Sequence, residues 1–272
     1  MDAHGEVQSG GGLVSFPDVS VGGVPIQVAD AESAAEAVIS WAVASRTQKL
    51  DLPVRLSNAY CLALASKDPD YRDLMLHRGI TFPDGFPVAW TARKLGYVNA
   101  EQVRGPALFE NVIRMGRGEQ LRHYFYGTND ETLSKLQEKL SSRYPGMITA
   151  GAFAPPFAPI DELMSDENIA RIQASHPDIV WVGLGTPKQD FVAVRLAERL
   201  GVPVLGVGAA FDFSAGTLDE APDVLRRAGL EWTYRLAKEP RRLWRRYLFG
   251  NARFMMLAAV DLREARRASR GA

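Results

Sequence analysis

The chain has 272 residues, of which 46% are hydrophobic, and its 32 basic side chains balance its 32 acidic ones. This length and apolar content suit one large domain, or one domain with an appendage, whose core needs no disulfide or structural metal. The single cysteine, Cys61, excludes an internal disulfide, and no apolar stretch approaches the roughly 18 residues of a membrane-spanning helix.

The first 18 residues are polar and glycine-rich and lack the pattern of a secretory signal, so we expect a disordered leader over 1–18. Apolar runs typical of strands then alternate with helical patterns. The expected strands cover residues 24–28, 53–57, 80–83, 123–127, 178–185 and 202–208. The expected helices cover residues 31–45 (with Asp30 as N-cap), 129–146, 167–177 and 188–201. This alternation predicts an α/β fold with a largely parallel sheet over 19–220.

The pattern changes near residue 221, after which no strand signal follows. From Arg226 to the end there are 13 basic and 4 acidic residues, a net charge of +9, which leaves −9 for the rest of the chain. We expect a helical basic appendage over 221–272. Because proline is disfavoured inside a helix, the sequence Glu239–Pro240 predicts two or three short helices here. The charge asymmetry suggests an anionic partner for the appendage.

Three of the expected strand ends carry residues suited to chemistry. Ligands of open α/β sheets bind at the carboxyl ends of strands, and Asp84 in TFPDGFPVAW lies where a catalytic carboxylate would. A Gly-x-Gly turn that ends at Gly185 precedes a helix, an arrangement that suits phosphate binding. Asp212 follows a glycine-rich strand end and is placed to bond a ribose or a base edge. Local pattern alone favours a turn or cap at both aspartates and leaves the Gly185 turn open between both interpretations.

Metal-dependent and nucleophilic chemistry has less support in the sequence. The four histidines show no metal-ligand spacing, and no G-x-S-x-G elbow is present. We therefore expect no metal site, no cofactor and no Ser-His-Asp triad.

Seven segments, taken in order, resemble a single family. They are Asn58 with its apolar helix, then PDGFPVAWTARKLG, YFYG, YPGMITAGAFAPPF, PDIVWVGLGTPKQD, GVGAAFDFSAG and GLEWTYRLAKEPRRLWRRYLFGNARF. Each segment is weak alone, but seven in one order are specific. The chain is similar to the bacterial WecG/TagA/CpsF glycosyltransferases from about residue 20 to about residue 256.

This resemblance implies a Rossmann-like α/β body and a C-terminal helical appendage that closes over the active site at the membrane. It implies inverting transfer of a hexose or N-acetylhexosamine from a UDP-sugar to a polyprenyl-diphosphate-linked saccharide, without a metal or cofactor. Family members act in cell-surface polysaccharide biosynthesis. The expected partners are a UDP-sugar donor, a polyprenyl-diphosphate-linked glycan acceptor and an anionic membrane surface. The expected location is cytoplasmic, peripheral on the inner face of the membrane.

The resemblance also assigns roles to individual residues. It places the general base at Asp84, because inverting transfer needs one carboxylate to take the proton from the attacking acceptor hydroxyl. Arginine forks suit diphosphate oxygens and would offset the charge of the leaving group where no metal does so. The substrate-binding positions that it implies are Asn58, the adjacent Ser57, Gly185, Gln189, Asp212, Arg235, Arg242 and Arg245.

Two positions depart from the family's pattern, and both belong to the expected sugar pocket. Leu56 occupies the place of a threonine that usually contacts the donor. Arg104 lies two positions after the place where family members often have an arginine, and we include it among the substrate-binding candidates. These departures leave the transferase chemistry standing and the identity of the donor sugar open.

Two other classes of function fit parts of the sequence. A nicotinamide-dependent oxidoreductase would suit an α/β chain with glycine turns, but the G-x-G-x-x-G sequence and an early acidic ribose-binding position are missing. A nucleic-acid binder would stack bases on Trp244 and Tyr247 in the basic appendage. Because the body is acidic and no nucleic-acid-binding motif is present, we expect no nucleic-acid partner.

Aromatic residues lie among the charges of the appendage, a mixture that favours a membrane interface over a solvated helix. We assign Arg241 and Arg246 to membrane phosphates, in contrast to the three arginines assigned to the substrate diphosphate. Trp244 and Tyr247 are expected to set the depth of docking. Removal of the chain after about residue 220 is expected to lower both membrane association and activity.

Overall fold

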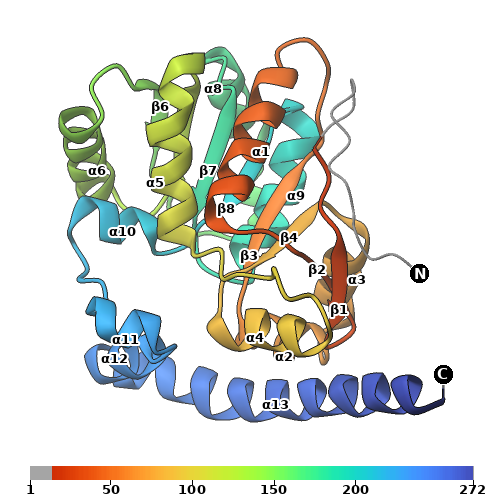
Figure 1. Cartoon of the computed structure of the whole chain (residues 1–272). Coiled ribbons are helices and arrows are strands. Elements are labelled where there is room, and N and C mark those ends of the chain that lie inside the picture. The colour runs from red at the N-terminus through yellow and green to blue at the C-terminus, as the bar shows by residue number, and fades with distance from the viewer. Residues whose placement is uncertain (1–13, 272) are drawn as a thin grey trace.

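The computed structural model describes residues 14–271, and the side chains of Arg227 and Arg242 lie outside the described part. Six strands form the central sheet: β3 (Pro53–Ser57), β4 (Ile80–Pro83), β5 (Arg122–Gly127), β6 (Ile148–Phe153), β7 (Ile179–Gly183) and β8 (Val204–Gly206). Their order is β4-β3-β8-β7-β5-β6, and every neighbouring pair is parallel (Figure 1). The predicted α/β class with a largely parallel sheet is confirmed.

Helices cover both faces of this sheet. One face packs against α1 (Ala31–Ala44), α5 (Gly105–Met115), α6 (Asp130–Arg143) and α10 (Ala210–Ala215). The other face packs against α7 (Ile160–Leu163), α8 (Asp166–Ala174) and α9 (Lys188–Leu200). A 3-10 turn, η1 (Gly116–Glu119), follows α5. These layers place the carboxyl ends of the strands along one edge of the molecule.

The central strands are buried on both faces, as parallel strands usually are. In β5 and β7, Phe125 and Trp181 face the layer of α1 and α5, whereas Tyr124, Tyr126 and Val180 face the layer of α9. Successive side chains of a strand point to opposite faces of the sheet. Because both faces are covered by helices, both sets are apolar, and the sequence shows continuous apolar runs at these strands.

Polar side chains begin the helices at the expected places. Asp30 caps α1 by accepting hydrogen bonds from the N–H groups of Glu32 and Ser33, both at 2.8 Å. Asn129 caps α6 by accepting from the N–H of Thr132 at 2.9 Å. The predicted N-cap Asp30 is therefore confirmed, and both caps satisfy backbone donors that a helix start leaves unpaired.

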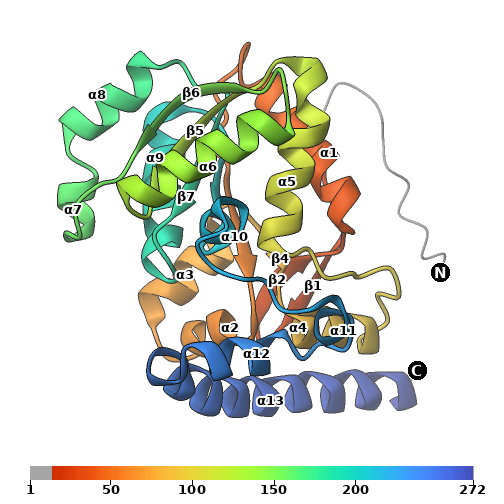
Figure 2. The ribbon, with the colours of Figure 1, turned by 90° about the vertical axis from the view of Figure 1, so that its left-hand side faces the viewer.

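A separate corner of the body joins both ends of the described chain. It consists of the antiparallel hairpin β1 (Asp18–Val21) and β2 (Val24–Gln27) with α2 (Ala59–Ala65), α3 (Pro69–His77) and α4 (Phe86–Lys94). The appendage follows the body as α11 (Asp223–Arg227), α12 (Glu231–Lys238) and α13 (Pro240–Gly271). Figures 1 and 2 show α13 along the base of the molecule, beneath α2 and α4.

α13 is part of the apolar core of this corner. Phe254 and Ala258 are buried in the same cluster as the side chains of the β1–β2 hairpin. In addition, the N–H of Gly22 in the hairpin turn donates to Asp261 Oδ2 at 2.6 Å. The last helix is therefore packed onto the body along much of its length.

Some features differ from the expectations. The helix break at Glu239–Pro240 is confirmed, but α13 has 32 residues and is not a short helix, because its apolar packing continues to Ala258. Of the expected leader, residues 1–13 lie outside the described residues. The remaining part is packed, since the ring of Phe16 makes edge contacts with Trp41 and Phe82. Within residues 14–271 no helix combines the length and apolar character needed to cross a membrane.

Candidate active site

A cavity of about 990 Å³ opens at the carboxyl ends of the strands, between the body and helices α12 and α13. Because parallel strands end at one edge of a sheet, residues far apart in the sequence meet there. The predicted site residues in its lining are Asn58, Asp84, Arg104, Gly185, Gln189, Asp212 and Arg235. Ser57, which is buried in β3, lies outside the lining.

Asp84 follows the end of β4 and is fixed by hydrogen bonds on several sides. Its N–H donates to the backbone oxygen of Ser57 at 3.0 Å, so Ser57 contributes through its main chain. Gln102 Nε2 donates to the backbone oxygen of Asp84 at 2.5 Å. The carboxylate Oδ1 accepts from the N–H of Gly105 at 2.9 Å. Among the described residues no donor bonds to Oδ2, which leaves one carboxylate oxygen available to a ligand.

The surroundings of Asp84 favour its protonated form. Burial raises the pKa of the Asp84 carboxyl above its ordinary value. The hydrogen bond from Gly105 acts in the opposite direction, the nearby Glu231 carboxylate raises the pKa further, and Arg104 and Arg235 lower it. A carboxylate with an elevated pKa is a stronger base than an ordinary aspartate, which suits proton abstraction near neutral pH.

Gly105 makes this arrangement possible by its lack of a side chain. A Cβ atom at this position would lie 3.2 Å from the backbone oxygen of Val207 and 3.4 Å from Leu56 Cδ1. The first of these contacts is tighter than most Cβ contacts, so a larger residue would shift the start of α5 by a few tenths of an ångström. The displacement would move the backbone N–H of residue 105, from which the Asp84 carboxylate accepts its hydrogen bond.

The amide residues of the cavity hold its loops. Asn58 caps α2, and its Oδ1 accepts from the N–H of Tyr60 at 3.1 Å. Gln189 Oε1 accepts from the N–H of Gly185 at 3.1 Å, which closes the turn after β7. Gly185 has a φ of +78°, a conformation that favours glycine. Both amide oxygens are therefore engaged in loop contacts, and among the described residues neither NH₂ group makes a hydrogen bond.

A buried hydrogen bond between Tyr71 and Asp190 lies next to Gln189. The next residue, Asp190, is buried and its Oδ2 accepts from the hydroxyl of Tyr71 at 2.7 Å. Burial raises the pKa of Asp190 to about 6, despite the hydrogen bond from Tyr71 and the nearby Arg55 guanidinium, which both lower it. This contact ties the first turn of α9 to α3 and so fixes the position of Gln189 in the cavity wall.

The far wall of the cavity includes Asp212 of α10. The backbone oxygen of Asp212 accepts from the N–H of Thr217 at 2.9 Å, which folds the chain back after the helix. Phe213, the next residue, lies beneath the guanidinium of Arg235 with its ring centroid 5.9 Å away. The body and the appendage therefore meet here across an aromatic ring.

Besides Arg235, the appendage contributes Arg226 and Arg246 to the cavity lining, and the sequence placed neither of them there. Arg246 lines the cavity, and its guanidinium carbon lies 4.3 Å from the centroid of the Tyr60 ring. Arg245 is exposed outside the lining, with its guanidinium 5.1 Å from the Trp244 ring. Successive helical residues point about 100° apart, so the two arginines of α13 face different surroundings. The side chain of Arg242 lies outside the described part.

The spacing of apolar residues in α13 indicates why Arg245 and Arg246 face different surroundings. Leu243, Gly250 and Phe254 mark the side of the helix that faces the body, and Arg246 lies between the first two on that side. Neither Arg235 nor Arg246 has a carboxylate partner among the described residues. Within the same part of the chain no group of three His, Cys, Asp or Glu side chains is arranged to hold a metal ion.

Comparison with known proteins gives this geometry a family. The model of the "Glycosyl transferase WecG/TagA/CpsF family" matches residues 19–268. The chain belongs to this family. The resemblance drawn from the seven sequence segments is thereby confirmed, and the finding decides against the nicotinamide-dependent oxidoreductase.

Two relatives carry the same name, N-acetylglucosaminyldiphosphoundecaprenol N-acetyl-beta-D-mannosaminyltransferase. The protein of Bacillus spizizenii is 29% identical over 185 residues, which cover 68% of this chain and 70% of the relative. The protein of Bacillus subtilis is 29% identical over 202 residues, which cover 74% of this chain and 77% of the relative. These names describe the two relatives, and the family makes the present chain a glycosyltransferase.

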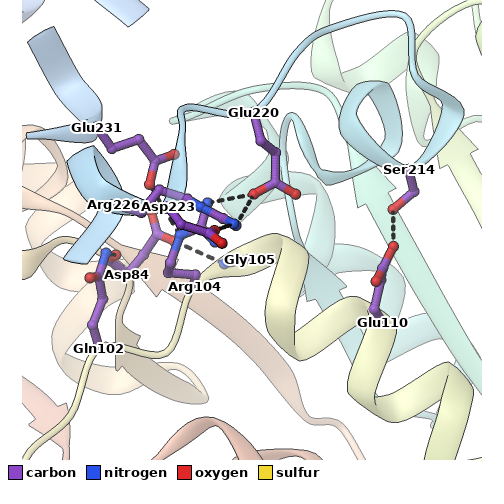
Figure 3. A network of polar contacts seen from close by, with 10 residues as sticks. All are labelled: Asp84, Gln102, Arg104, Gly105, Glu110, Ser214, Glu220, Asp223, Arg226 and Glu231. Atoms are coloured by element: carbon purple, nitrogen blue, oxygen red, sulfur yellow. Dashed lines mark hydrogen bonds and ion pairs between the residues drawn. The ribbon is translucent and has the colours of Figure 1, made fainter. Parts of the chain in front are cut away.

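In this glycosyltransferase, Arg104 lines the cavity but is already bonded to two carboxylates. Its Nε donates to Glu231 Oε2 at 3.1 Å, and its Nη2 donates to Glu220 Oε2 at 3.0 Å (Figure 3). Burial alone would lower the pKa of Arg104, but the two glutamates outweigh it and raise the pKa. Sequence reasoning identified neither glutamate, because each belongs to the appendage or its connection and is distant from Arg104 in the sequence.

Proposed function

We propose that this glycosyltransferase moves a hexose or an N-acetylhexosamine from a UDP-sugar to a polyprenyl-diphosphate-linked saccharide in cell-surface polysaccharide biosynthesis. The observation that carries the proposal is Asp84, a carboxylate of raised pKa in a cavity whose lining also includes Arg235 and Arg246, neither of which forms an ion pair with a described carboxylate. The two relatives are named for transfer to an N-acetylglucosaminyl-diphosphoundecaprenol, which is an acceptor of this class.

In the proposed reaction, Asp84 takes the proton of the acceptor hydroxyl as that oxygen attacks the anomeric carbon of the donor. The new carbon–oxygen bond forms on the face opposite the leaving group, so the configuration inverts. The bond to UDP breaks, and UDP leaves with the electron pair. One carboxylate is sufficient, because no covalent sugar–enzyme intermediate forms.

Two arginines are placed to stabilise the departing diphosphate. Arg235 and Arg246 approach the cavity from α12 and α13, and guanidinium groups form paired hydrogen bonds with phosphate oxygens. Their charge would offset the charge that develops on UDP, without a metal ion. We further propose that Asn58 and Gln189 donate to the donor sugar through their NH₂ groups, and that Gly185 and Asp212 contact the nucleotide.

Transfer assays with the full chain test this function. We expect labelled sugar to move from at least one member of a UDP-hexose and UDP-N-acetylhexosamine panel to a short-chain polyprenyl-diphosphate saccharide, with release of UDP. UDP should also raise the unfolding temperature of the protein, because a ligand that binds the native state stabilises it, whereas NAD should not. Stabilisation by NAD without UDP binding, and no transfer from any donor, would contradict the proposal.

We also propose that α13 docks on anionic lipids at the inner face of the cytoplasmic membrane. The side of α13 that points away from the body exposes large apolar residues together with arginines, a combination that suits a lipid interface. The exposed apolar residues are Trp244, Leu248, Phe249, Met255, Met256 and Val260. Arg245 belongs to this outer side, and we assign it to lipid phosphates.

Removal of two aromatic residues tests the docking. We expect the double substitution Trp244→Ala and Phe249→Ala to weaken binding to phosphatidylglycerol vesicles by about tenfold or more, because each ring buries apolar area in the interface. Sedimentation of the protein with vesicles measures this. Phe157→Ala is the matched control, since Phe157 is fully exposed on a loop of the body. Equal binding by the double variant and the wild type would contradict the docking.

A further inference from the structure

Arg104 connects the body to the appendage through several polar contacts. It lies at the N-terminus of α5, and the two glutamates that it bonds lie on either side of α11. Glu220 precedes α11, and Glu231 begins α12. Arg226 of α11 also donates to Glu220 Oε2, at 2.6 Å, so Glu220 is shared by two arginines (Figure 3). One body residue thus contacts both ends of the α11 segment.

These contacts are partly shielded from water. The side chain of Arg104 is 16% exposed, and those of Glu231 and Glu220 are 23% and 33% exposed. Hydrogen bonds between ionised groups are stronger than those between neutral ones, and shielding reduces the screening that makes exposed ion pairs weak. The network is therefore a stronger link than an ion pair on the open surface.

The other contacts between α12 and the body are exposed or aromatic: Lys238 Nζ lies 3.7 Å from Asp219 Oδ2, and the Arg235 guanidinium lies over the Phe213 ring. None of the eight residues of α12 is buried, in contrast to α13, which places Phe254 and Ala258 in the core. Elements with few buried apolar contacts open at low free energy. The contact between Arg104 and Glu231 is thus an ion pair that ties the start of α12 to the body, and α12 carries Arg235 and Trp232 in the cavity wall.

We propose that Arg104 is a positioning residue, which through Glu220 and Glu231 holds α12 closed against the body and so places Arg235 over the cavity. The role in catalysis rests on the proposed function, whereas the closing contact does not. Arg104 thereby differs from a substrate contact, because its donors face protein carboxylates. Release of the contact would let Arg235 and Trp232 move away from the cavity that Asp84 lines.

The contact also couples closure to the charge around Asp84. Glu231 and Arg104 lie close enough to shift the pKa of Asp84 in opposite directions, and Arg235 acts in the same direction as Arg104. Closure therefore brings one carboxylate, Glu231, and one guanidinium, Arg235, to the base, beside the guanidinium of Arg104, which belongs to the body. An open α12 would remove Glu231 and Arg235 from its surroundings.

Hydrogen exchange of the full chain tests the closing contact without any substrate. We expect Arg104→Gln to raise amide exchange across residues 223–238 by roughly tenfold or more, because charge-assisted bonds to two carboxylates are lost. Exchange in the central strands should stay unchanged. Arg104→Lys should restore part of the protection, since it keeps the charge but loses the fork. Arg46→Gln is the control, because Arg46 bonds Asp178 in two places within the body.

A double-mutant cycle and kinetics separate positioning from direct contact. As a single substitution, Glu231→Gln should raise amide exchange in α12. In the Arg104→Gln background it should raise that exchange little further if the two side chains act together. Both variants should lower turnover of the UDP-sugar. The factor by which kcat falls should be larger than the factor by which the donor KM changes. Unchanged α12 exchange in Arg104→Gln would overturn the proposal, as would lost turnover in Arg104→Gln with full turnover in Glu231→Gln. Absence of turnover in every variant, wild type included, would overturn the proposed function and leave the exchange result standing.

Discussion

Asp84→Asn is expected to lower kcat by about 100- to 10,000-fold, the usual contribution of a positioned general base. Asparagine keeps the size of the side chain and the oxygen that Gly105 bonds, but it cannot take the proton of the acceptor hydroxyl. The donor KM should change little, because the lost interaction belongs to the transition state. Initial rates at saturating donor and acceptor measure the effect. Full activity in Asp84→Asn would show that another group is the base.

The pH dependence of the rate adds a second test of Asp84. The base acts in its deprotonated form, so the rate should fall as the pH drops through its pKa. Because burial raises that pKa, the acidic limb should lie at a higher pH than for an ordinary aspartate. The residual rate of Asp84→Asn should lack this limb.

Folding stability provides the control for Asp84. A folded-state pKa above the unfolded value means that the native state disfavours the ionised carboxyl, and this cost is present at neutral pH. Asp84→Asn removes the charge, so its unfolding temperature should equal or exceed that of the wild type. Asp161→Asn, at an exposed carboxylate of α7, should leave the rate unchanged. A fall in stability large enough to unfold Asp84→Asn at the assay temperature would contradict this reading of its surroundings.

Phe254→Ala is expected to lower the free energy of unfolding by about 3–5 kcal/mol, as large-to-small changes in a packed core usually do. Phe254 is 1% exposed and joins α13 to the cluster of α2, α3 and the β1–β2 hairpin. The loss is large against the roughly 5–15 kcal/mol of a typical domain, so the appendage should also detach at lower denaturant concentration. Urea unfolding followed by circular dichroism measures it.

The neighbouring residue provides a matched comparison for Phe254. Met255 is 58% exposed on the outer side of α13, and Met255→Ala should change stability by no more than about 0.5 kcal/mol. Equal losses in the two variants would show that α13 is not anchored through its buried side. They would also weaken the assignment of Arg246 to the cavity, because Arg246 belongs to that side.

Much of the fold was predictable, because the local and long-range signals agree. The strands around Asp84 and Gly185 are continuous apolar runs that end in glycine or polar residues, as buried parallel strands do. β6 was missed because Ile148–Phe153 is a half-exposed edge strand with small residues and no alternation. One of these, Gly151, is small because a Cβ there would lie 2.7 Å from the ring of Tyr124. This requirement comes from the partner strand, and the local sequence does not show it.

The candidate site was predictable where it follows the strand ends and less so in the appendage. Asp84, Asn58 and Asp212 meet because parallel strands share an edge. The arginines depend on how α13 is rotated about its axis, which its apolar spacing indicates only once the helix is known to begin at Pro240. The partners of Arg104 depend on tertiary contacts across more than a hundred residues, which no local pattern encodes.

The bond between Gly22 and Asp261 has a consequence for the order of assembly. These two residues are 239 positions apart, so the hairpin is synthesised well before its partner on α13. At about 5–20 residues per second, the interval is roughly 12–48 seconds. During that time the parallel sheet has all its strands before the hairpin corner has its covering helix. Until α13 has been made, the apolar cluster of this corner lacks Phe254 and Ala258.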